Sequence, residues 1–385
     1  MDAPTEPARE ARFPKWAAAL TNQDAFQHEQ ARLGRIWTFL GLTQDVQKDG
    51  DWFTAELGGR SVFVQRFGEK LRGFENRCAH RFYPLRTAEK GNGKIKCGFH
   101  HWTYNHEGRA VHIPRCEHFY GVTAKEMNAR IAPIEVATCG ALVFGRFQHP
   151  HDRETLTQFL GEGAPIMQAM CRPKARARRL AFEVAANWKL CYHITLDDYH
   201  SPAVHPTTFG VAGYLPRHAI RYFRFGPHNA FFPAADENAL QTMIRECKDG
   251  SFRPVRYRIF QFFPNLLIAL FRGQYHVEGK DDKHWYVNIQ HFQPVAPERT
   301  FLRSWYFRAP FDMGRGSLGQ LYDACIEPFR KAVIEYKLRT VHSEDNGVVE
   351  RQQQFASQQA GWPRLGYAEE RIKWFEEAYA KALAD

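Results

Sequence analysis

Residues 76–104 read NRCAHRFYPLRTAEKGNGKIKCGFHHWTY and contain two short arms, each with one cysteine and one histidine. The arms pair Cys78 with His80 and Cys97 with His100, and sixteen residues separate them. Two thiolates can bind one iron of a [2Fe-2S] cluster while two neutral imidazoles bind the other, and this exchange of sulfur for nitrogen raises the reduction potential. The stretch therefore predicts a cluster that accepts and passes on single electrons.

A structural zinc site is the main alternative, because two cysteines and two histidines are also a common set of zinc ligands. Zinc sites usually place two cysteines two to four residues apart and two histidines further on, whereas each arm here carries one of each. Unrelated core cysteines and histidines are the second alternative. The mixed arms and their turn-rich surroundings favour the iron–sulfur cluster.

Short β-prone segments and turns surround both arms. Residues 52–57 and 61–66 flank a Gly58-Gly59 turn, and further turn signals follow up to residue 108. These signals predict a small all-β domain over residues 36–152. Glycines and exposed backbone amides in its turns can approach a cluster closely.

Helical spacing and strand signals alternate outside this domain. The expected helices cover residues 14–39, 155–170, 313–339 and 367–383, and the expected strands cover residues 256–271, 283–295 and 300–308. We therefore predict an α+β protein. Its all-β domain is inserted in a larger mixed α/β domain, which comprises a helical part at residues 1–35 and residues 153–385 and has an antiparallel sheet with helical cover.

Composition and charge limit the remaining possibilities. The 385 residues are 44% hydrophobic, which is enough for a large core in two or three domains. Of eight cysteines, the six outside the arms show no disulfide framework, so a reducing compartment is expected. The N-terminus has no apolar signal-peptide core, and no apolar run reaches membrane-spanning length. We expect a cytoplasmic protein with no membrane partner.

The net charge of +10 admits nucleic acid or an acidic protein as a partner. No nucleic-acid-binding motif accompanies the charge, and the basic run at residues 172–179 is typical of an exposed strand face. We therefore expect no nucleic acid. A basic surface would instead attract an acidic electron carrier.

A second group of metal-binding residue types lies in residues 187–206. Asp197 and His200 are three residues apart and are expected to share a helix face, while His205 lies past the helix-breaking Pro202. Two histidines and one carboxylate leave open positions on Fe(II) for O2 and substrate. The two histidines could instead be core or surface groups.

The missing carboxylate has to come from elsewhere in the chain. Asp345 is the best candidate and Glu344 is the alternative, although adjacent acidic residues on a helix more often form a solvated face.

From the two arms to the C-terminal helix, the chain resembles the α subunits of Rieske non-haem iron oxygenases, which hydroxylate aromatic rings or remove methyl groups. Their second motif corresponds to Asn187-Trp188, to residues 197–200 and to His205, and their late Glu-Asp pair corresponds to Glu344-Asp345, followed by residues 352–354. The resemblance implies a Rieske [2Fe-2S] cluster on Cys78, His80, Cys97 and His100, and a mononuclear Fe(II) on His200, His205 and Asp345.

The resemblance also implies a catalytic role for Asp197. In the family the equivalent aspartate bridges an iron-bound histidine and a Rieske histidine of the neighbouring subunit in a head-to-tail trimer. Here the bridged pair would be His200 and His100. A buried carboxylate that accepts from both imidazoles would fix their orientation. We therefore expect a homotrimer, to which a β subunit could add.

Three positions depart from the family pattern. His193 replaces a usual asparagine, Phe82 follows Arg81 where Arg-Gly is common, and His101 replaces a frequent glycine. None of these changes removes a ligand. His193 could be a hydrogen-bond donor behind the iron ligands or a packed helix residue, and we expect the former.

The reaction implied by the resemblance uses O2 and electrons from NAD(P)H, which reach this chain from a separate reductase or ferredoxin. The expected outcome is hydroxylation of an organic, aromatic substrate. Monooxygenation or oxidative demethylation of a non-aromatic molecule remains an alternative. A Rieske electron-transfer protein without oxygenase activity, or a zinc-stabilised nucleic-acid-binding protein, would be of a different class.

Apolar side chains between the histidine motif and Asp345 are expected to include the walls of a substrate pocket, although most will belong to the core. The candidates are Phe209, Phe223, Phe231, Phe232, Phe260, Phe262, Phe263, Leu266, Leu267 and Phe271. Nearby arginines could pair with a carboxylate on an aromatic ring, although exposed strand faces are their default place. They are Arg221, Arg224, Arg256, Arg258 and Arg272.

Overall fold

A computed structural model describes residues 16–149, 153–207, 213–272, 284–311, 317–358 and 363–384. The chain divides into two compact units, one of residues 29–159 and one of residues 1–28 together with 160–385. A unit built from both ends of the chain is what insertion of one domain into another produces. The expected boundaries at residues 35 and 152 stay predictions.

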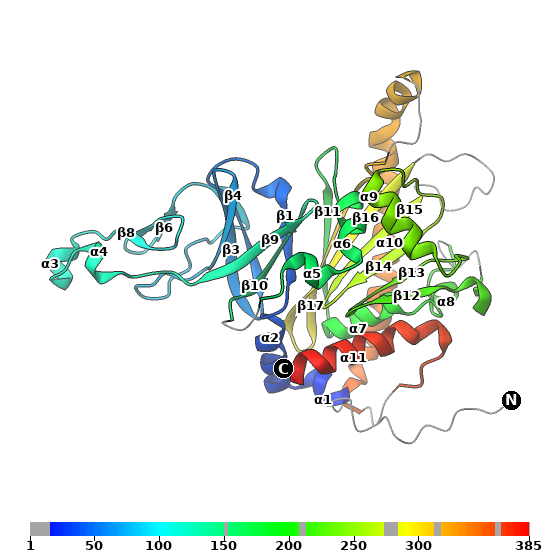
Figure 1. Ribbon diagram of the computed structural model, residues 1–385. Helices are drawn as coiled ribbons and strands as arrows, with labels where there is room; N and C mark the ends of the chain where they lie inside the picture. Colours follow the sequence, from blue (N-terminus) through cyan, green and yellow to red (C-terminus); the bar gives the residue numbers. More distant parts are fainter. Residues whose placement is uncertain are drawn as a thin grey trace. The chain divides into compact units, whose positions relative to one another are not determined.

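The unit of residues 29–159 contains a seven-stranded antiparallel sheet in the order β1-β10-β9-β4-β3-β2-β5 (Figure 1). Its strands are β1 (Thr38–Leu42), β2 (Asp51–Leu57), β3 (Arg60–Phe67), β4 (Lys70–Glu75), β5 (Lys90–Asn92), β9 (Pro133–Cys139) and β10 (Leu142–Phe147). Gly58 and Gly59 join β2 to β3 with φ values of 54° and 71°. A two-residue hairpin turn of type I′ needs positive φ at both central positions, so the predicted glycine turn is confirmed.

A three-stranded sheet in the order β6-β7-β8 follows in the same unit. Its strands are β6 (Ile95–Lys96), β7 (Thr103–Tyr104) and β8 (Ala110–His112), and two short helices follow, α3 (Cys116–Tyr120) and α4 (Ala124–Met127). The sequence did not predict these helices, because four or five residues are too few for a helical period. Cys78 and Cys97 both lie in a hydrophobic core that also contains Trp102 and Phe63 of β3.

The larger unit is built on a second seven-stranded antiparallel sheet in the order β11-β17-β16-β15-β14-β13-β12. Its strands are β11 (Arg178–Val184), β12 (Tyr222–Phe225), β13 (His228–Phe231), β14 (Arg258–Phe262), β15 (Leu266–Arg272), β16 (Trp285–Ala296) and β17 (Arg299–Arg308). The single strand expected over residues 256–271 is in fact the hairpin β14–β15. Both strands are buried, so the apolar run hides the turn.

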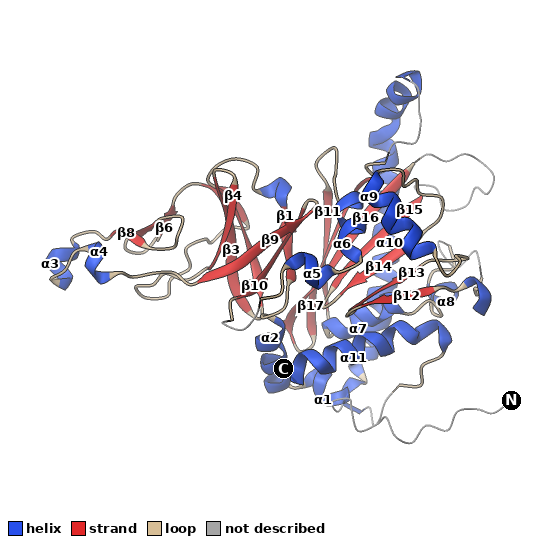
Figure 2. Cartoon of the chain, viewed as in Figure 1, coloured by secondary structure: helices blue, strands red, loops and turns tan. Residues whose placement is uncertain are grey.

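The other helices of the described chain belong to either unit, and Figure 2 draws them in blue. The α-helices are α1 (Trp16–Thr21), α2 (Gln23–Leu33), α5 (Leu156–Leu160), α6 (Gly163–Met170), α7 (Trp188–His193), α8 (Ser201–Val204), α9 (Ala239–Asp249), α10 (Ser317–Gln354) and α11 (Glu370–Ala384). Short 3-10 turns lie at Thr43–Asp45, Ile194–Leu196, Arg217–Ala219, Ala356–Gln358 and Tyr367–Glu369. In the larger unit, α7 packs on β16 and β17, α10 on β11 and α11 on β13. The α+β fold with an antiparallel sheet and helical cover is confirmed.

Several expected helices differ in extent. The helix expected over residues 14–39 is two helices, α1 and α2, which end at Leu33 before β1; residues 14 and 15 lie outside the described residues. The helix expected over 155–170 is also two helices, α5 and α6. The helix expected over 313–339 runs from Ser317 to Gln354, so it also carries Glu344 and Asp345; residues 313–316 lie outside the described residues. Within the described chain, no helix is both long enough and apolar enough to cross a membrane.

Candidate metal centres and substrate cavity

The two cysteine–histidine arms form matching backbone loops. In each loop the amide four residues beyond the cysteine donates to the cysteine's carbonyl: Phe82 to Cys78 and His101 to Cys97, both at 3.0 Å. Phe82 and His101 adopt left-handed φ values of 60° and 59°. Both are positions where the resemblance expects glycine, because only glycine takes this conformation without a steric cost.

The cysteines lie at the buried side of these loops, each 1% exposed. The Tyr104 hydroxyl is 3.0 Å from Cys78 Sγ and accepts the Ala79 N–H at 3.1 Å. Burial and the neighbouring Cys78 raise the pKa of Tyr104, so the hydroxyl keeps its proton and donates it to the sulfur. A donor to a ligand sulfur is one of the means by which proteins tune iron–sulfur potentials.

The histidines of the arms lie nearer the surface and face each other, with ring centroids 4.6 Å apart. His80 stacks on Trp102 and approaches the Tyr120 hydroxyl through Nε2, at 3.2 Å. Its Nδ1 is buried, and no described residue forms a hydrogen bond with it. Burial, then the charge of His100, lowers the pKa of His80 and keeps the ring neutral. An unpartnered inner nitrogen beside two buried thiols fits a Rieske cluster.

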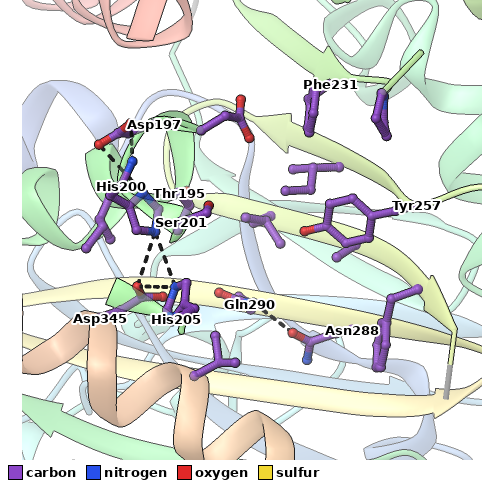
Figure 3. Close-up of a pocket in the computed structure, with 18 of the residues that line it drawn as sticks. Thr195, Asp197, His200, Ser201, His205, Phe231, Tyr257, Asn288, Gln290 and Asp345 are labelled. Atoms are coloured by element: carbon purple, nitrogen blue, oxygen red, sulfur yellow. Dashed lines mark hydrogen bonds and ion pairs between the residues drawn. The ribbon is translucent and has the colours of Figure 1, made fainter. Parts of the chain in front are cut away.

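In the larger unit, His200, His205 and Asp345 converge on one point, with their ligand atoms all within 4.8 Å of one another. Asp345 Oδ1 lies 3.0 Å from His205 Nε2 and 3.5 Å from His200 Nε2, and the two Nε2 atoms are 3.3 Å apart. Figure 3 shows the three side chains pointing toward one another. Two imidazole nitrogens and a carboxylate oxygen in this arrangement fit the ligand set of a mononuclear Fe(II) oxygenase.

The segment that carries Asp197 and His200 is not the expected helix. Asp197 has an extended backbone, with φ −107° and ψ 115°, and its Oδ1 accepts the amides of Tyr199 and His200 at 2.6 and 3.1 Å. This side-chain turn, and no shared helix face, brings Asp197 back to His200. Pro202 does not break a helix; it lies in the first turn of α8, where proline is tolerated.

Two further carboxylates face the outer nitrogens of the imidazoles. Asp197 Oδ2 lies 3.6 Å from His200 Nδ1, and Glu344 Oε2 lies 2.8 Å from His205 Nδ1. A carboxylate at this position fixes the orientation of a metal-binding histidine and raises its basicity. The structure thus separates the neighbouring acids of α10: Asp345 lies on the inner side of the histidines and Glu344 on the outer side.

These acidic neighbours control the protonation of the site. Burial lowers the pKa of His200, but the hydrogen bonds and charges of Asp197 and Asp345 outweigh it and raise that pKa to about 10. The same competition raises the pKa of His205. Burial raises the pKa of Asp345, yet its contacts with both histidines lower it below the usual value. The site therefore strongly favours a positive charge between its carboxylates.

A cavity of about 650 Å³ opens beside this triad. Of the expected apolar walls, Phe231, Leu267 and Phe271 line it, whereas Phe260 and most others lie in the core; Phe209 lies outside the described residues. Among the five candidate arginines, the two that line the cavity are Arg256 and Arg272. The sequence missed its polar floor, which Asn288 and Gln290 of β16 provide.

A buried ion pair holds the ligand segment from behind. Arg371 of α11 is 0% exposed and lies 2.7 Å from Asp198 Oδ2, which also accepts the Tyr222 hydroxyl at 2.8 Å. The Asp198 amide donates to the Ala368 carbonyl at 3.1 Å. Nothing local in the sequence marks Arg371, because a basic residue on an amphipathic helix is usually solvated.

His193 lies on α7 and contacts α11. Its Nε2 is 2.9 Å from Glu376 Oε1, and its ring packs edge-on against Phe375. These contacts give it a partner in helix packing, and a role as donor behind the iron ligands stays a prediction.

Comparisons with known proteins match both units. Residues 173–385 match the family described as ring hydroxylating alpha subunit (catalytic domain), and residues 36–130 match the Rieske [2Fe-2S] domain. The chlorobenzene dioxygenase subunit alpha of Cupriavidus sp. (strain PS12) is 31% identical over 205 residues, 51% of this chain and 44% of that protein. The carnitine monooxygenase oxygenase subunit of Escherichia coli (strain K12) is 28% identical over 193 residues, 48% of this chain and 50% of that protein.

The chain thus spans about half the length of the curated relatives it matches. A crystal structure of naphthalene 1,2-dioxygenase from Rhodococcus sp. bound to indole superimposes with a TM-score of 0.73 at 18% identity. The match covers 96% of this chain and 94% of that one, and it shows the fold.

Proposed function

We propose that the chain is a terminal oxygenase component, which uses O2 and electrons from a partner protein to hydroxylate an organic substrate. The premise is that the chain belongs to the ring hydroxylating alpha subunit family and carries a Rieske [2Fe-2S] domain in addition to the family's iron-binding catalytic domain. The observation that carries the proposal is the convergence of His200, His205 and Asp345 beside the cavity.

The proposed ligands follow from the two geometries. Cys78, Cys97, His80 and His100 would hold the cluster, and His200, His205 and Asp345 would hold the mononuclear iron. When bound, the cluster supplies single electrons and the iron supplies the chemistry that activates O2.

The remaining residues of the site would orient the proposed iron ligands and enclose the substrate. Glu344 holds Nδ1 of His205 at 2.8 Å and Asp197 faces Nδ1 of His200 at 3.6 Å, so each imidazole would present its inner nitrogen to the triad. The Arg371–Asp198 ion pair keeps the segment of Asp197 in place. Apolar cavity walls exclude water from the open side of the triad and bind the substrate.

We propose an aromatic substrate, neutral or acidic. Phe231, Tyr257 and Phe271 line the cavity, and Arg256 and Arg272 bring positive charge to it. A cationic molecule, as the relative named for carnitine would suggest, is repelled by these two arginines and could not draw on a free carboxylate to offset that repulsion. The carboxylates that line the cavity are those of Asp197, Asp198 and Asp345, and each of them faces a protein partner. Asp345 faces both triad histidines, Asp197 faces His200, and Asp198 faces Arg371.

Electrons would come from NAD(P)H through a separate reductase or ferredoxin. We further propose a homotrimer in which Asp197 bridges His200 to His100 of a neighbouring copy, with a β subunit as an optional addition. None of the eight cysteines forms a disulfide, which supports our proposal of a reducing compartment such as the cytoplasm.

Metal analysis and spectroscopy of the anaerobically purified protein test this proposal. We expect two cluster irons and one mononuclear iron per chain, and a rhombic EPR spectrum after dithionite reduction. With a reductase, NADH and a panel of aromatic acids, O2 consumption should be matched by product. Cluster iron alone would instead identify an electron-transfer protein, and a colourless zinc protein with salt-sensitive DNA binding would reject the proposal.

The bridging role has its own test. The Asp197→Ala variant should keep all three irons yet lose turnover coupled to electron transfer, because its carboxylate orients and connects the ligands without being one of them. Retained product formation by this variant would reject the bridge.

A further inference from the structure

The floor of the cavity carries two amide side chains on one strand. Asn288 and Gln290 are two residues apart on β16, so both project from the same face of the sheet, and both line the cavity. Asn288 is 1% exposed and Gln290 is half-buried. Burial of an amide in an apolar cavity costs free energy unless its polar atoms form hydrogen bonds. The hydrogen bonds of Asn288 and Gln290 therefore show how the two amides are oriented.

The orientation of Asn288 is fixed by the main chain. Its Nδ2 lies 3.0 Å from the Trp305 carbonyl and 2.7 Å from Ser304 Oγ. A main-chain carbonyl can only accept, so the atom of Asn288 that faces it has to be the nitrogen. The oxygen of the same amide, Oδ1, is therefore turned toward Gln290.

The orientation of Asn288 in turn fixes Gln290. Asn288 Oδ1 can only accept, and it takes a hydrogen bond from Gln290 Nε2 at 2.7 Å. The Gln290 carbonyl oxygen, Oε1, is left on the other side of the amide. Figure 3 shows the Gln290 amide between the triad and Asn288. Within the described part of the chain, no group donates to Gln290 Oε1, although Gln290 lines the cavity.

The pair is also anchored on its far side. Ser304 Oγ lies 3.0 Å from His342 Nε2, and His342 belongs to α10, the helix that carries Asp345. Burial lowers the pKa of His342 to about 4, so this end of the network is uncharged. A chain of hydrogen bonds from β16 through Ser304 of β17 to His342 of α10 holds the amide of Gln290 in one orientation.

We propose that Gln290 Oε1 binds an O–H or N–H group of the substrate, so that the substrate is an aromatic molecule with a hydroxyl or ring N–H group held beside the iron triad. The ring itself would lie against Phe231, Leu267 and Ile259, which line the same cavity. This substrate class rests on the proposed oxygenase function. A preoriented acceptor discriminates strongly, because a substrate without a donor displaces water from this carbonyl and leaves it unpaired.

Isosteric pairs of probe molecules test the proposal by calorimetry on the anaerobic holoenzyme. Phenol and toluene differ by O–H against CH3, and indole and indene differ by N–H against CH2. Each pair is titrated into the wild-type protein and into Gln290→Met, which keeps the length of the side chain and removes the acceptor. In each pair we compare the dissociation constant of the probe with the O–H or N–H group with that of its partner. In Gln290→Met this ratio should be about tenfold higher than in the wild-type protein.

Leu267→Met is the matched control, because Leu267 lies directly across from Gln290 on β15 and changes the wall without changing the acceptor. In Leu267→Met the dissociation constants of both probes in a pair should change by the same factor. If Gln290→Met does not fold, Gln290→Asn withdraws the carbonyl by one methylene and gives the same readout.

Equal ratios in wild type and variant, or failure of all four probes to bind, would overturn the proposal. Iron content and the EPR spectrum are measured on the same preparation. Loss of the mononuclear iron or of the cluster signal would mean that the proposed function has failed. Intact centres without a preference for donors would mean that only this inference has failed.

Discussion

The two metal-binding regions are built in opposite ways. In the cysteine–histidine arms the backbone determines where the proposed ligands lie, because the amides of Phe82 and His101 each donate to the carbonyl of the cysteine in their own loop. In the triad, carboxylates determine how the histidines are oriented, because Asp197 and Glu344 face the outer nitrogens of the two rings. The arms are local in sequence, whereas the triad gathers acidic groups from distant segments. The triad should therefore respond to charge and pH, and the arms to backbone conformation.

The largest expected effect separates the two regions completely. Asp345→Ala removes the carboxylate on the inner side of both histidines, and we expect the mononuclear iron to be lost while the colour and EPR signal of the cluster remain. Metal analysis alongside EPR measures both centres in one sample. Persistence of the mononuclear iron would show that the ligand assignment is wrong, and loss of both centres would show that the regions are not independent.

A smaller effect should follow from the carboxylate on the outer side. Glu344→Gln keeps the shape of the side chain but weakens its hold on His205 Nδ1, so the affinity for Fe(II) should fall by roughly 10- to 100-fold. Equilibrium titration of chelator-treated protein gives the affinity. Ser343→Ala, at the preceding exposed position on the same helix, is the control and should bind Fe(II) as the wild type does. An unchanged affinity in Glu344→Gln would remove the contrast between the two regions.

The charge around the triad also predicts how iron loading depends on pH. With the pKa of His200 raised to about 10 by Asp197 and Asp345, the ring is protonated at neutral pH, and Fe(II) has to displace a proton to bind. The affinity for Fe(II) should therefore rise with pH, by about tenfold per pH unit for each proton released, up to that pKa. Titrations at several pH values with proton-release measurements test this, and a flat profile would contradict it.

The same contrast decides what the sequence could predict. All four proposed cluster ligands lie in one short stretch, and the glycine turn and strands around them carry strong local signals. The two histidines of the triad also share one segment, but the choice between Glu344 and Asp345 depends on which face of α10 meets them. Only the folded geometry separates the inner from the outer carboxylate.

Other features had no local signal. The turn made by Asp197 replaced an expected helix, because a side chain that accepts two backbone amides competes with helix formation. Burial of Arg371 depends on Asp198, far away in the sequence. Asn288 and Gln290 follow Val287 and Ile289 in an ordinary polar–apolar alternation, and the role of Gln290 emerges only from the partners that orient it.

The smallest expected effect concerns the backbone of the arms. Phe82 holds a left-handed φ of 60°, and its side chain is 67% exposed. Phe82→Gly removes a steric cost of roughly 1 kcal/mol and loses little buried surface, apart from the contact with Arg77, whose guanidinium lies 5.0 Å from the ring centroid. The free energy of unfolding should rise by about 0.5–1 kcal/mol. Arg81→Gly, one residue earlier, is the matched control because Arg81 lies outside the left-handed region. Glycine at this position should lower the free energy of unfolding by a similar amount. Thermal loss of the cluster absorbance reports both changes. A rise in stability for both variants, or for neither, would show that backbone strain does not distinguish these two positions of the arm.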